Sequence, residues 1–286
     1  MSAAWQRLLF GPSSLETDAD HVVWFDAVAS RLLCGCQLVA GGVAHRITEV
    51  EFYYRGGSHL DPFAHRDPVQ VENGRWYFHR TGGVYRGGSF KGLDLTFGPP
   101  SAFGGILIRG LEQQDGPLFD GPSLCVDHLL RLNGVASVAA LDAAIAGRSL
   151  WDDSSPLWLR WVDPPADRPI LRTARVGLSL KRLRQSEGPA RFLMRRYRYL
   201  TEPRRISKGK PHMVLALHAD GKSPDEIRAL TNATRAAIGR YLADFVEGRA
   251  EADFTRYFGL EIGPRDLARL HGLWHVEYGS EVRQAF

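Results

Sequence analysis

The chain has 286 residues, of which 44% are apolar and 24% are charged, so it can form one large soluble domain or two. No apolar run is long enough to span a bilayer and no signal peptide is recognisable, so we expect an intracellular protein. The three cysteines, Cys34, Cys36 and Cys125, are too few and wrongly spaced for a disulfide framework or a zinc site, and we expect no metal or other cofactor.

The net charge of +4 is unevenly distributed along the chain. Between Leu171 and Lys210 there are thirteen lysines or arginines and only two acidic residues, Glu187 and Glu202. We call this segment the basic stripe, and its charge density is typical of a surface that contacts phosphate backbones. The alternative is a basic surface that has no partner.

The first pattern along the chain is helical. Residues 1–20 are poorly patterned, and we expect them to be irregular. A rough apolar stripe then predicts a helix over residues 20–33, with Asp20 as its N-terminal cap.

A hairpin is expected next. Residues 34–39 read as a strand, in which the Cys-x-Cys of Cys34 and Cys36 is a strand alternation, and Gly41-Gly42 is typical of a tight hairpin turn. The turn leads into a second strand that begins at Arg46.

The segment RITEVEFYYRGGSHLDPFAH, residues 46–65, carries the most informative pattern. Its first half is rich in β-branched and aromatic residues, as in a strand, so Glu49, Glu51 and Tyr53 should share one face, with the two glutamates about 7 Å apart. A carboxylate on a half-buried strand needs a charged or hydrogen-bonding partner, or a functional role. With His65 after the following turn, this set could activate a water beside a bound ring. The alternative is that both glutamates lie on a solvated or salt-bridged edge.

The remaining patterns up to residue 205 predict an α+β domain, residues 1–205, on a mixed and largely antiparallel sheet. Arg109 is expected at the end of its strand, and the glycine-rich segment RTGGVYRGG, residues 80–88, is expected to be a loop. Strands are predicted over residues 76–79, 89–97, 105–109, 157–162 and 172–178, and helices over residues 123–132 and 135–146.

Residues 206–286 have a helical pattern and predict a small all-α C-terminal domain. A first helix is expected over residues 212–219, and Ser223-Pro224-Asp225-Glu226 has the cap, proline and glutamate that begin a second. The turn Asn232-Ala233-Thr234 leads to a third helix over residues 235–246. This is a helix-turn-helix pattern that carries Arg235 and Arg240, although such units also serve as plain packing modules.

Several stretches, in the same order along the chain, resemble the alkyladenine (3-methyladenine) DNA glycosylase family over about residues 21–203. They are Trp24-Phe25-Asp26 through Leu33, Arg46 to Tyr53, Asp61 to His65, Ile106 to Glu112, Gly121 to Cys125, Arg175-Val176-Gly177 and Arg191-Phe192.

The resemblance implies a fold and a set of catalytic roles. Glu51 matches the general base that activates the hydrolytic water, and Arg109 with the backbone carbonyl of Val176 matches the groups that position this water. Tyr53 matches an aromatic residue that stacks on the extruded base, and His65 matches a residue that lines the base pocket. One carboxylate can suffice when the base is a good leaving group, and the base must leave the duplex to be reached.

The resemblance further implies double-stranded DNA as the partner, a monomer near the nucleoid in the cytoplasm, and a role in DNA repair by base excision. Since no lysine matches a Schiff-base nucleophile, we expect hydrolysis without strand cleavage. Beyond Glu51, Arg109, Val176, Tyr53 and His65, we expect His79 and Thr96 in the base pocket. The residues expected to contact DNA are Tyr85, Arg182, Arg184, Arg195, Arg196, Arg235 and Arg240.

The sequence departs from the family pattern around the base pocket. The second stacking tyrosine corresponds to Trp76-Tyr77-Phe78-His79, and the wedge tyrosine has only Tyr85, at the tip of the glycine-rich insertion, as a candidate. The asparagine that screens purines is replaced near Asp94 or Thr96. The excised base can therefore differ from an alkylated purine.

Two other functions remain open from the sequence. One is a non-catalytic DNA-binding protein that uses the basic stripe and the helix-turn-helix. The other is a glycosidase or nucleosidase that uses Glu49 and Glu51, although two glutamates on one face suit an acid and a base on opposite sides of a bond poorly.

Overall fold

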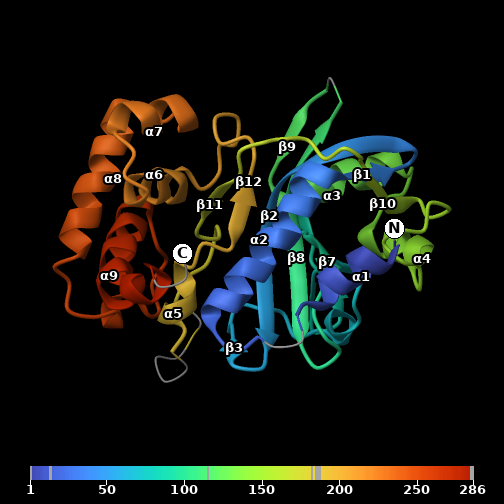
Figure 1. The fold of residues 1–286 in the computed structure, drawn as a ribbon, viewed down its shortest axis with the longest axis horizontal. Helices are drawn as coiled ribbons and strands as arrows, with labels where there is room; N and C mark the ends of the chain where they lie inside the picture. The colour runs from blue at the N-terminus through green and yellow to red at the C-terminus, as the bar shows by residue number, and fades with distance from the viewer. Residues whose placement is uncertain (1, 13–14, 115, 182, 184–187, 284–286) are drawn as a thin grey trace. The chain divides into compact units, whose positions relative to one another are not determined.

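The computed structural model describes the whole chain except residues 1, 13–14, 115, 182, 184–187 and 284–286. The described residues divide into two compact units, shown in Figure 1. We call residues 1–60 and 64–170 the sheet unit, and residues 61–63 and 171–286 the helical unit. The main part of the helical unit begins at Leu171, whereas the sequence suggested a domain boundary after residue 205. The boundary after residue 205 stays a prediction.

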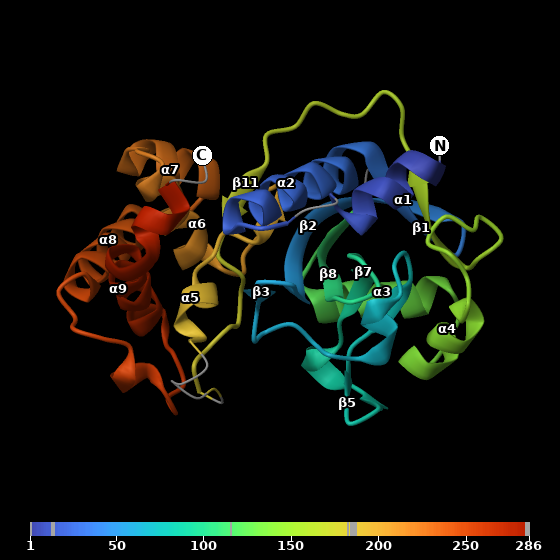
Figure 2. The same cartoon turned by 60° about the horizontal axis from the view of Figure 1, so that its bottom comes forward.

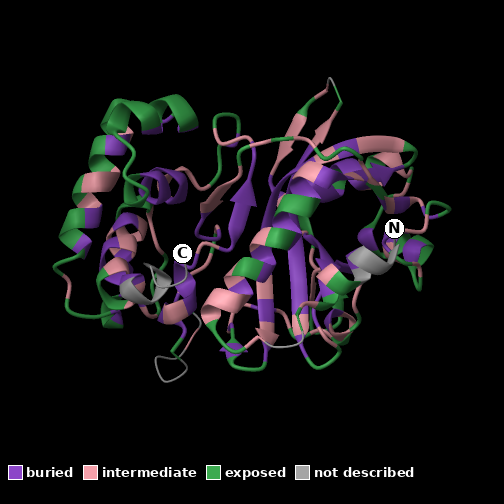
Figure 3. Ribbon diagram, viewed as in Figure 1, coloured by how far each residue is buried: buried purple, intermediate pink, exposed green. Residues whose placement is uncertain are grey.

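The sheet unit is built on a large antiparallel sheet, and the α+β class predicted from the sequence is confirmed. Its central strands β2 and β8 are buried along most of their length (Figure 3). The strand order is β10 (Leu157–Trp161), β1 (Cys36–Ala40), β2 (Val43–Gly56), β8 (Phe103–Gln113), β7 (Leu93–Thr96) and β4 (Trp76–Phe78). Two short strands, β3 (His59–Leu60) and β9 (Leu118–Asp120), pair with β2 and β8.

Helices cover both faces of this sheet (Figure 2). Helix α2 packs on one face, where Phe25 stacks on Phe52 with ring centroids 4.9 Å apart. Because side chains alternate along a strand, Glu51 and Tyr53 project from the other face. The helices of this unit are α1 (Ser2–Phe10), α2 (Asp18–Gly35), α3 (Pro122–Leu132) and α4 (Val138–Ile145).

The N-terminal expectations need three corrections. Residues 2–10 form helix α1 rather than irregular chain, since Trp5 packs against two distant tryptophans that the local sequence does not show. Helix α2 is capped by Thr17, and Asp20 is its partner in a capping box. Cys34 lies in the last turn of α2 and Cys36 is the first residue of β1, so the two cysteines do not belong to one strand.

The sequence predicted the chain turn correctly at one glycine pair and incorrectly at another. Gly41 and Gly42 have φ angles of 53° and 79° and close the predicted hairpin. Residues 80–88 do not form a simple loop: β5 (Arg80–Thr81) and β6 (Val84–Tyr85) pair as a hairpin around Gly82-Gly83, whose positive φ angles suit the same tight turn.

The helical unit holds two short strands and a set of helices. Strand β11 is shorter than the predicted strand over residues 172–178, because the chain turns at Val176-Gly177. The elements are β11 (Leu171–Thr173), α5 (Ala190–Leu193), β12 (Arg198–Leu200), α6 (Lys210–Ala219), α7 (Pro224–Thr231), α8 (Arg235–Gly248) and α9 (Pro264–Arg283).

Helices α7 and α8 follow one another across a short turn, and their assignment as a helix-turn-helix stays a prediction. Ser223 caps α7 in a capping box with Glu226, and Asn232 ends it in the left-handed conformation with a φ of 58°. Thr234 then caps α8. No helix in the described part of the chain is long and apolar enough to cross a membrane.

Candidate active site

A buried ionic cluster lies between β2 and β8. The Arg109 Nε donates to Glu49 Oε1 at 2.7 Å and lies 3.3 Å from Glu51 Oε1. Both carboxylates are fully buried, and the hydroxyl of the half-buried Tyr53 donates to Glu51 Oε2 at 2.8 Å. Burial alone would lower the pKa of Arg109, but Glu51 and Glu49 outweigh it and raise this pKa above its usual value. Arg109 therefore stays charged.

An irregularity in strand pairing aims Arg109 at both glutamates. Glu49 pairs with Gly110 and Val50 pairs with Ile108, so Arg109 is an extra residue on β8 at this point. A bulge of this kind bends a strand and redirects a side chain. Arg109 thus lies in the middle of β8, and the expectation that it ends its strand was wrong.

Glu51 belongs to a row of residues that crosses four strands. It pairs with Leu107 on β8, which pairs with Asp94 on β7, which pairs with Tyr77 on β4. Residues directly opposite each other project from the same face of a sheet. Asp94 therefore lies on the face of Glu51, two strand spacings or roughly 10 Å away.

A second polar group is built around Asp94. His79 Nε2 lies 2.7 Å from Asp94 Oδ1, the rings of His65 and His79 have centroids 4.5 Å apart, and His65 Nδ1 is 3.2 Å from the Tyr77 hydroxyl. Burial, aided by His79, lowers the pKa of His65 to about 4. His65 is therefore neutral at neutral pH and can form part of an aromatic wall. The structure brings together Glu51, Arg109 and Tyr53, and separately His65 and His79.

Thr96 lies on β7 but its hydroxyl is engaged. It accepts from the Arg75 amide at 2.9 Å and donates to the carbonyl of Glu72. Thr96 thereby fastens β7 to the turn before β4, and its role in a base pocket stays a prediction.

Sequence reasoning missed Gln70, which lies in the short 3-10 helix Pro68–Val71. Its side chain is 1% exposed and packs near Asp94 at Gly105. A lone glutamine between two valines carries no motif, so no signal in the sequence could have identified it.

Comparison with known proteins identifies relatives of this chain. The chain is 31% identical over 187 residues to a protein of Rhizobium johnstonii named "Putative 3-methyladenine DNA glycosylase", and the match covers 62% of this chain and 86% of that relative. The chain belongs to the 3-methyladenine DNA glycosylase family. The family that the sequence motifs resemble is thus confirmed.

Other relatives extend this result. A protein of Nocardia farcinica with the same name is 31% identical over 176 residues, which is 57% of this chain and 80% of the relative. An uncharacterized protein of Acanthamoeba polyphaga mimivirus is 30% identical over 188 residues, which is 60% of this chain and 86% of the relative. No protein-family model matches the sequence.

Some arginines of the basic stripe lie in the core of the protein rather than on its surface. Arg175 and Arg198 are fully buried and Arg195 is 4% exposed. Arg175 forms an ion pair with Asp61, and Arg195 donates to the Arg191 carbonyl. Internal acceptors therefore take part of the charge of the basic stripe, and its contact with phosphate backbones stays a prediction. Composition alone cannot distinguish a buried arginine from an exposed one.

Tyr85 does not lie at the tip of the glycine-rich insertion, where the wedge residue was expected. The tip of the hairpin is Gly82-Gly83, and Tyr85 lies half-buried behind it. Its hydroxyl donates to Asp142 Oδ2 at 2.6 Å, and the Arg80 guanidinium lies 4.7 Å from its ring centroid. Tyr85 is therefore tethered to α4, and a role against DNA stays a prediction.

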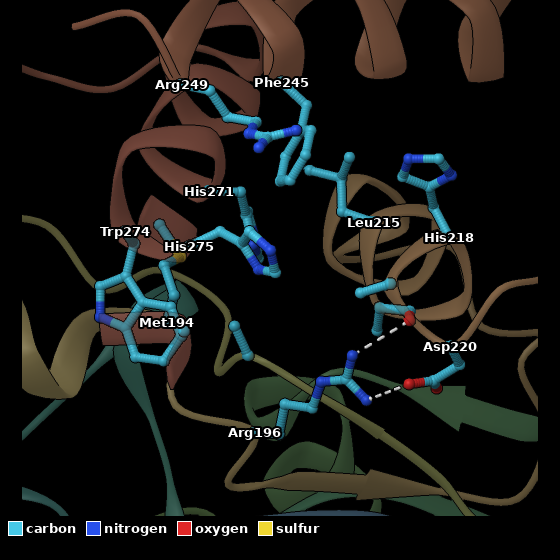
Figure 4. A pocket seen from close by; sticks show the side chains of 14 residues that line it. Met194, Arg196, Leu215, His218, Asp220, Phe245, Arg249, His271, Trp274 and His275 are labelled. Carbon is cyan, nitrogen blue, oxygen red and sulfur yellow. Dashed lines mark hydrogen bonds and ion pairs between the residues drawn. The ribbon is translucent and has the colours of Figure 1, made fainter. Parts of the chain in front are cut away.

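Arg196 lines a cavity of about 420 Å³ within the helical unit (Figure 4). Its guanidinium donates to Asp220 Oδ1 at 2.7 Å and to the Ala216 carbonyl at 3.1 Å, so it caps the C-terminal end of α6. Trp274 and His271 of α9 also line this cavity. It contains none of the predicted catalytic residues.

The other predicted residues of the family site lie in the helical unit. Val176 is half-buried in the turn after β11, and Arg182 and Arg184 lie outside the described residues. Arg235 and Arg240 are exposed on α8, and Arg235 pairs with the equally exposed Asp225 at 2.7 Å. Their contacts with DNA stay predictions.

Proposed function

We propose that this chain is a monofunctional DNA glycosylase. It extrudes a modified base from double-stranded DNA and hydrolyses the N-glycosidic bond with a water activated by Glu51, without strand cleavage. The observation that carries the proposal is the fully buried Glu51 carboxylate, held by Arg109 and by Tyr53 in a member of this family.

The carboxylates of the cluster suit this chemistry. Those of Glu49 and Glu51 both lie within ion-pair distance of the Arg109 guanidinium. A fixed negative charge stabilises the oxocarbenium-like state that forms as the base departs. Glu51 then takes the proton of the attacking water, and the Val176 carbonyl is the proposed second group that orients this water.

The neighbouring rings suit an extruded base. Tyr53 is half-buried next to Glu51 on the same sheet face, and His65 and His79 are half-buried on the neighbouring strands and turns. Flipped bases are held by stacking between such aromatic groups. We assign base stacking to Tyr53 and the pocket wall to His65 and His79.

A second candidate is a non-catalytic DNA-binding protein. The exposed Arg235 and Arg240 on α8 favour it, since two helices joined by a short turn, as α7 and α8 are, can form a DNA-binding helix–turn–helix. The nucleosidase alternative is disfavoured, because Glu49 is occupied by Arg109 on the same side as Glu51 and cannot face it across a bond.

The deciding experiment is base release from genomic DNA that carries varied modifications, with the released bases identified by mass spectrometry. We expect abasic sites with the native protein and none with Glu51→Gln, which retains DNA binding. The matched control is Glu112→Gln, which removes a carboxylate paired with Arg46 on the same two strands. Native protein that releases no base, or a Glu51→Gln variant as active as the control, would reject the proposal.

A further inference from the structure

The helical unit contains a cavity of about 420 Å³ that the proposed reaction does not use (Figure 4). Small-molecule sites in proteins are concave and typically enclose about 300–1,000 Å³. Helices α6, α8 and α9 supply most of the walls, and every described residue that lines the cavity belongs to this unit. The cavity is therefore a candidate ligand site separate from the cluster around Glu51.

Aromatic side chains form one part of the lining. The rings of Phe245 on α8 and His275 on α9 have centroids 5.8 Å apart, and Trp274 is the preceding residue of α9. The Trp274 indole nitrogen donates to the Ala190 carbonyl at 2.9 Å, so the indole offers a ligand only its apolar surface. Such rings favour contact with another planar ring, either stacked or edge-on. This part of the lining therefore suits a flat, apolar group.

The charged part of the lining is positive. It has two arginines, whereas Asp220 is the one acidic residue among the described residues that line the cavity. The Arg196 guanidinium is held by Asp220 and by the Ala216 carbonyl. Arg249 follows α8 and is exposed, and its guanidinium has no ion-pair partner in the described part of the chain. Asp220 thus balances Arg196, and Arg249 leaves a positive charge for a ligand.

His271 adds a hydrogen-bonding group near Arg249. A Cβ atom at Gly272 would lie 2.9 Å from the Arg249 amide nitrogen, so Arg249 passes close to the turn of α9 that carries His271. His271 Nε2 lies 2.8 Å from His212 Nδ1, and burial, with a smaller effect of Arg196, lowers the pKa of His271 to about 3. The ring is therefore neutral at neutral pH, with one nitrogen that donates and one that accepts. When His212 donates within the pair, His271 Nδ1 carries the proton and can donate to an anion.

We propose that this cavity binds a small planar aromatic carboxylic acid. The ring packs against Phe245 and Trp274, and the carboxylate pairs with Arg249, with His271 as a further donor. Arginine binds carboxylates through two parallel hydrogen bonds, which fixes the orientation of the ligand. A single carboxylate matches the single unbalanced guanidinium, whereas a phosphate dianion would bring a second negative charge that no described lining arginine is free to meet. The inference goes beyond the proposed function and does not depend on it.

The test is titration calorimetry of the full chain with naphthoate, with its neutral analogue naphthamide, and with acetate, which has the charge without the ring. We expect naphthoate to bind with a Kd below about 1 mM. Naphthamide and acetate should each bind at least about 10-fold more weakly, because each lacks one of the two recognised groups. Naphthoate should also raise the midpoint of thermal unfolding, since it binds the folded chain. No binding of naphthoate, or equal affinity for naphthamide or acetate, would overturn the inference.

Variants at Arg249 test whether the ligand lies in this cavity. Arg249→Gln removes the charge at an exposed position, so the fold should survive, and the affinity for naphthoate should fall by about 10- to 100-fold. Arg249→Lys keeps the charge and should retain most of the affinity. Arg228→Gln, at an exposed position of α7 outside the cavity lining, is the matched control and should bind as the native protein does. Native affinity in Arg249→Gln, or an equal loss in Arg228→Gln, would place the ligand elsewhere and reject the proposed site.

Discussion

Arg109 and Glu51 form an ion pair across β8 and β2 that is closed to solvent, with 3.3 Å between Nε and Oε1 and side chains 6% and 0% exposed. The pair exists because β8 carries one extra residue where it passes Glu49. A buried pair of this kind is costly to break, since the remaining charge has no water to receive it.

The first prediction concerns the loss of this cation. Arg109→Met leaves Glu49 and Glu51 buried without it, and we expect a loss of about 3–5 kcal/mol in the free energy of unfolding, measured with urea. Adding Glu49→Gln should recover part of the loss, because one buried charge is gone. Arg46→Met, which breaks a more exposed pair with Glu112, should cost less. Equal losses for the two arginines would contradict this account.

The second prediction separates the ring of Tyr53 from its hydroxyl. Tyr53→Phe keeps the stacking surface but removes the hydrogen bond to Glu51 Oε2. Single-turnover base release should fall by roughly 10-fold, as a hydrogen bond to a charged group is worth about 1.5–3 kcal/mol. Tyr53→Ala should fall further, because the stacking surface is lost too. If both variants lose the same amount, the ring does not stack on the base.

The third prediction concerns stability at acid pH. The folded-state pKa of His65 is about 4, against 6.5 for the free side chain, chiefly through burial and then His79, with Asp94 opposing. Below pH 6.5 the unfolded chain therefore binds a proton that the folded chain does not, so stability falls as the pH drops from 6.5 to 4. The contribution is roughly 3 kcal/mol, since one pKa unit corresponds to about 1.4 kcal/mol.

Replacing His65 should remove this component. Urea unfolding of His65→Gln between pH 7 and pH 4 should show a shallower fall than the native protein. His218→Gln, at an exposed position of α6, is the matched control and should follow the native curve. A His65→Gln curve with the native slope would place the acid sensitivity elsewhere.

Much of the fold could be predicted from local sequence patterns. The alternating pattern of residues 46–54 predicted β2, and Ser223 caps α7 where the sequence predicted a cap. These features depend on neighbours within a few positions, which a single sequence displays. The sheet faces of Glu51 and Tyr53 follow from the same alternation.

The features that escaped the sequence depend on distant partners. The bulge at Arg109 is a mismatch between two strands and has no local signature. Arg175 was read as surface charge, although Asp61 and a carbonyl of Phe192 hold it in the core. The buried position of Gln70 depends on Gly105, on another element, because a side chain there would clash with the Gln70 amide. Pair geometry of this kind must be seen in three dimensions.

The last prediction tests DNA contact by α8. Arg235 and Arg240 are exposed on this helix. Arg235 pairs with the solvent-exposed Asp225, and such a pair is too exposed to hold Arg235 away from a phosphate. If each neutralises one phosphate, Arg235→Ala with Arg240→Ala should lower the slope of log affinity against log salt by about 2, measured on duplex DNA of any sequence. Arg265→Ala, at an exposed position of α9, is the matched control and should leave the slope unchanged. An unchanged slope for the double variant would make α7 and α8 a packing module.

Because the substitutions lie far from β2 in the sequence, base release from saturating DNA should persist, which separates binding by α8 from catalysis by Glu51.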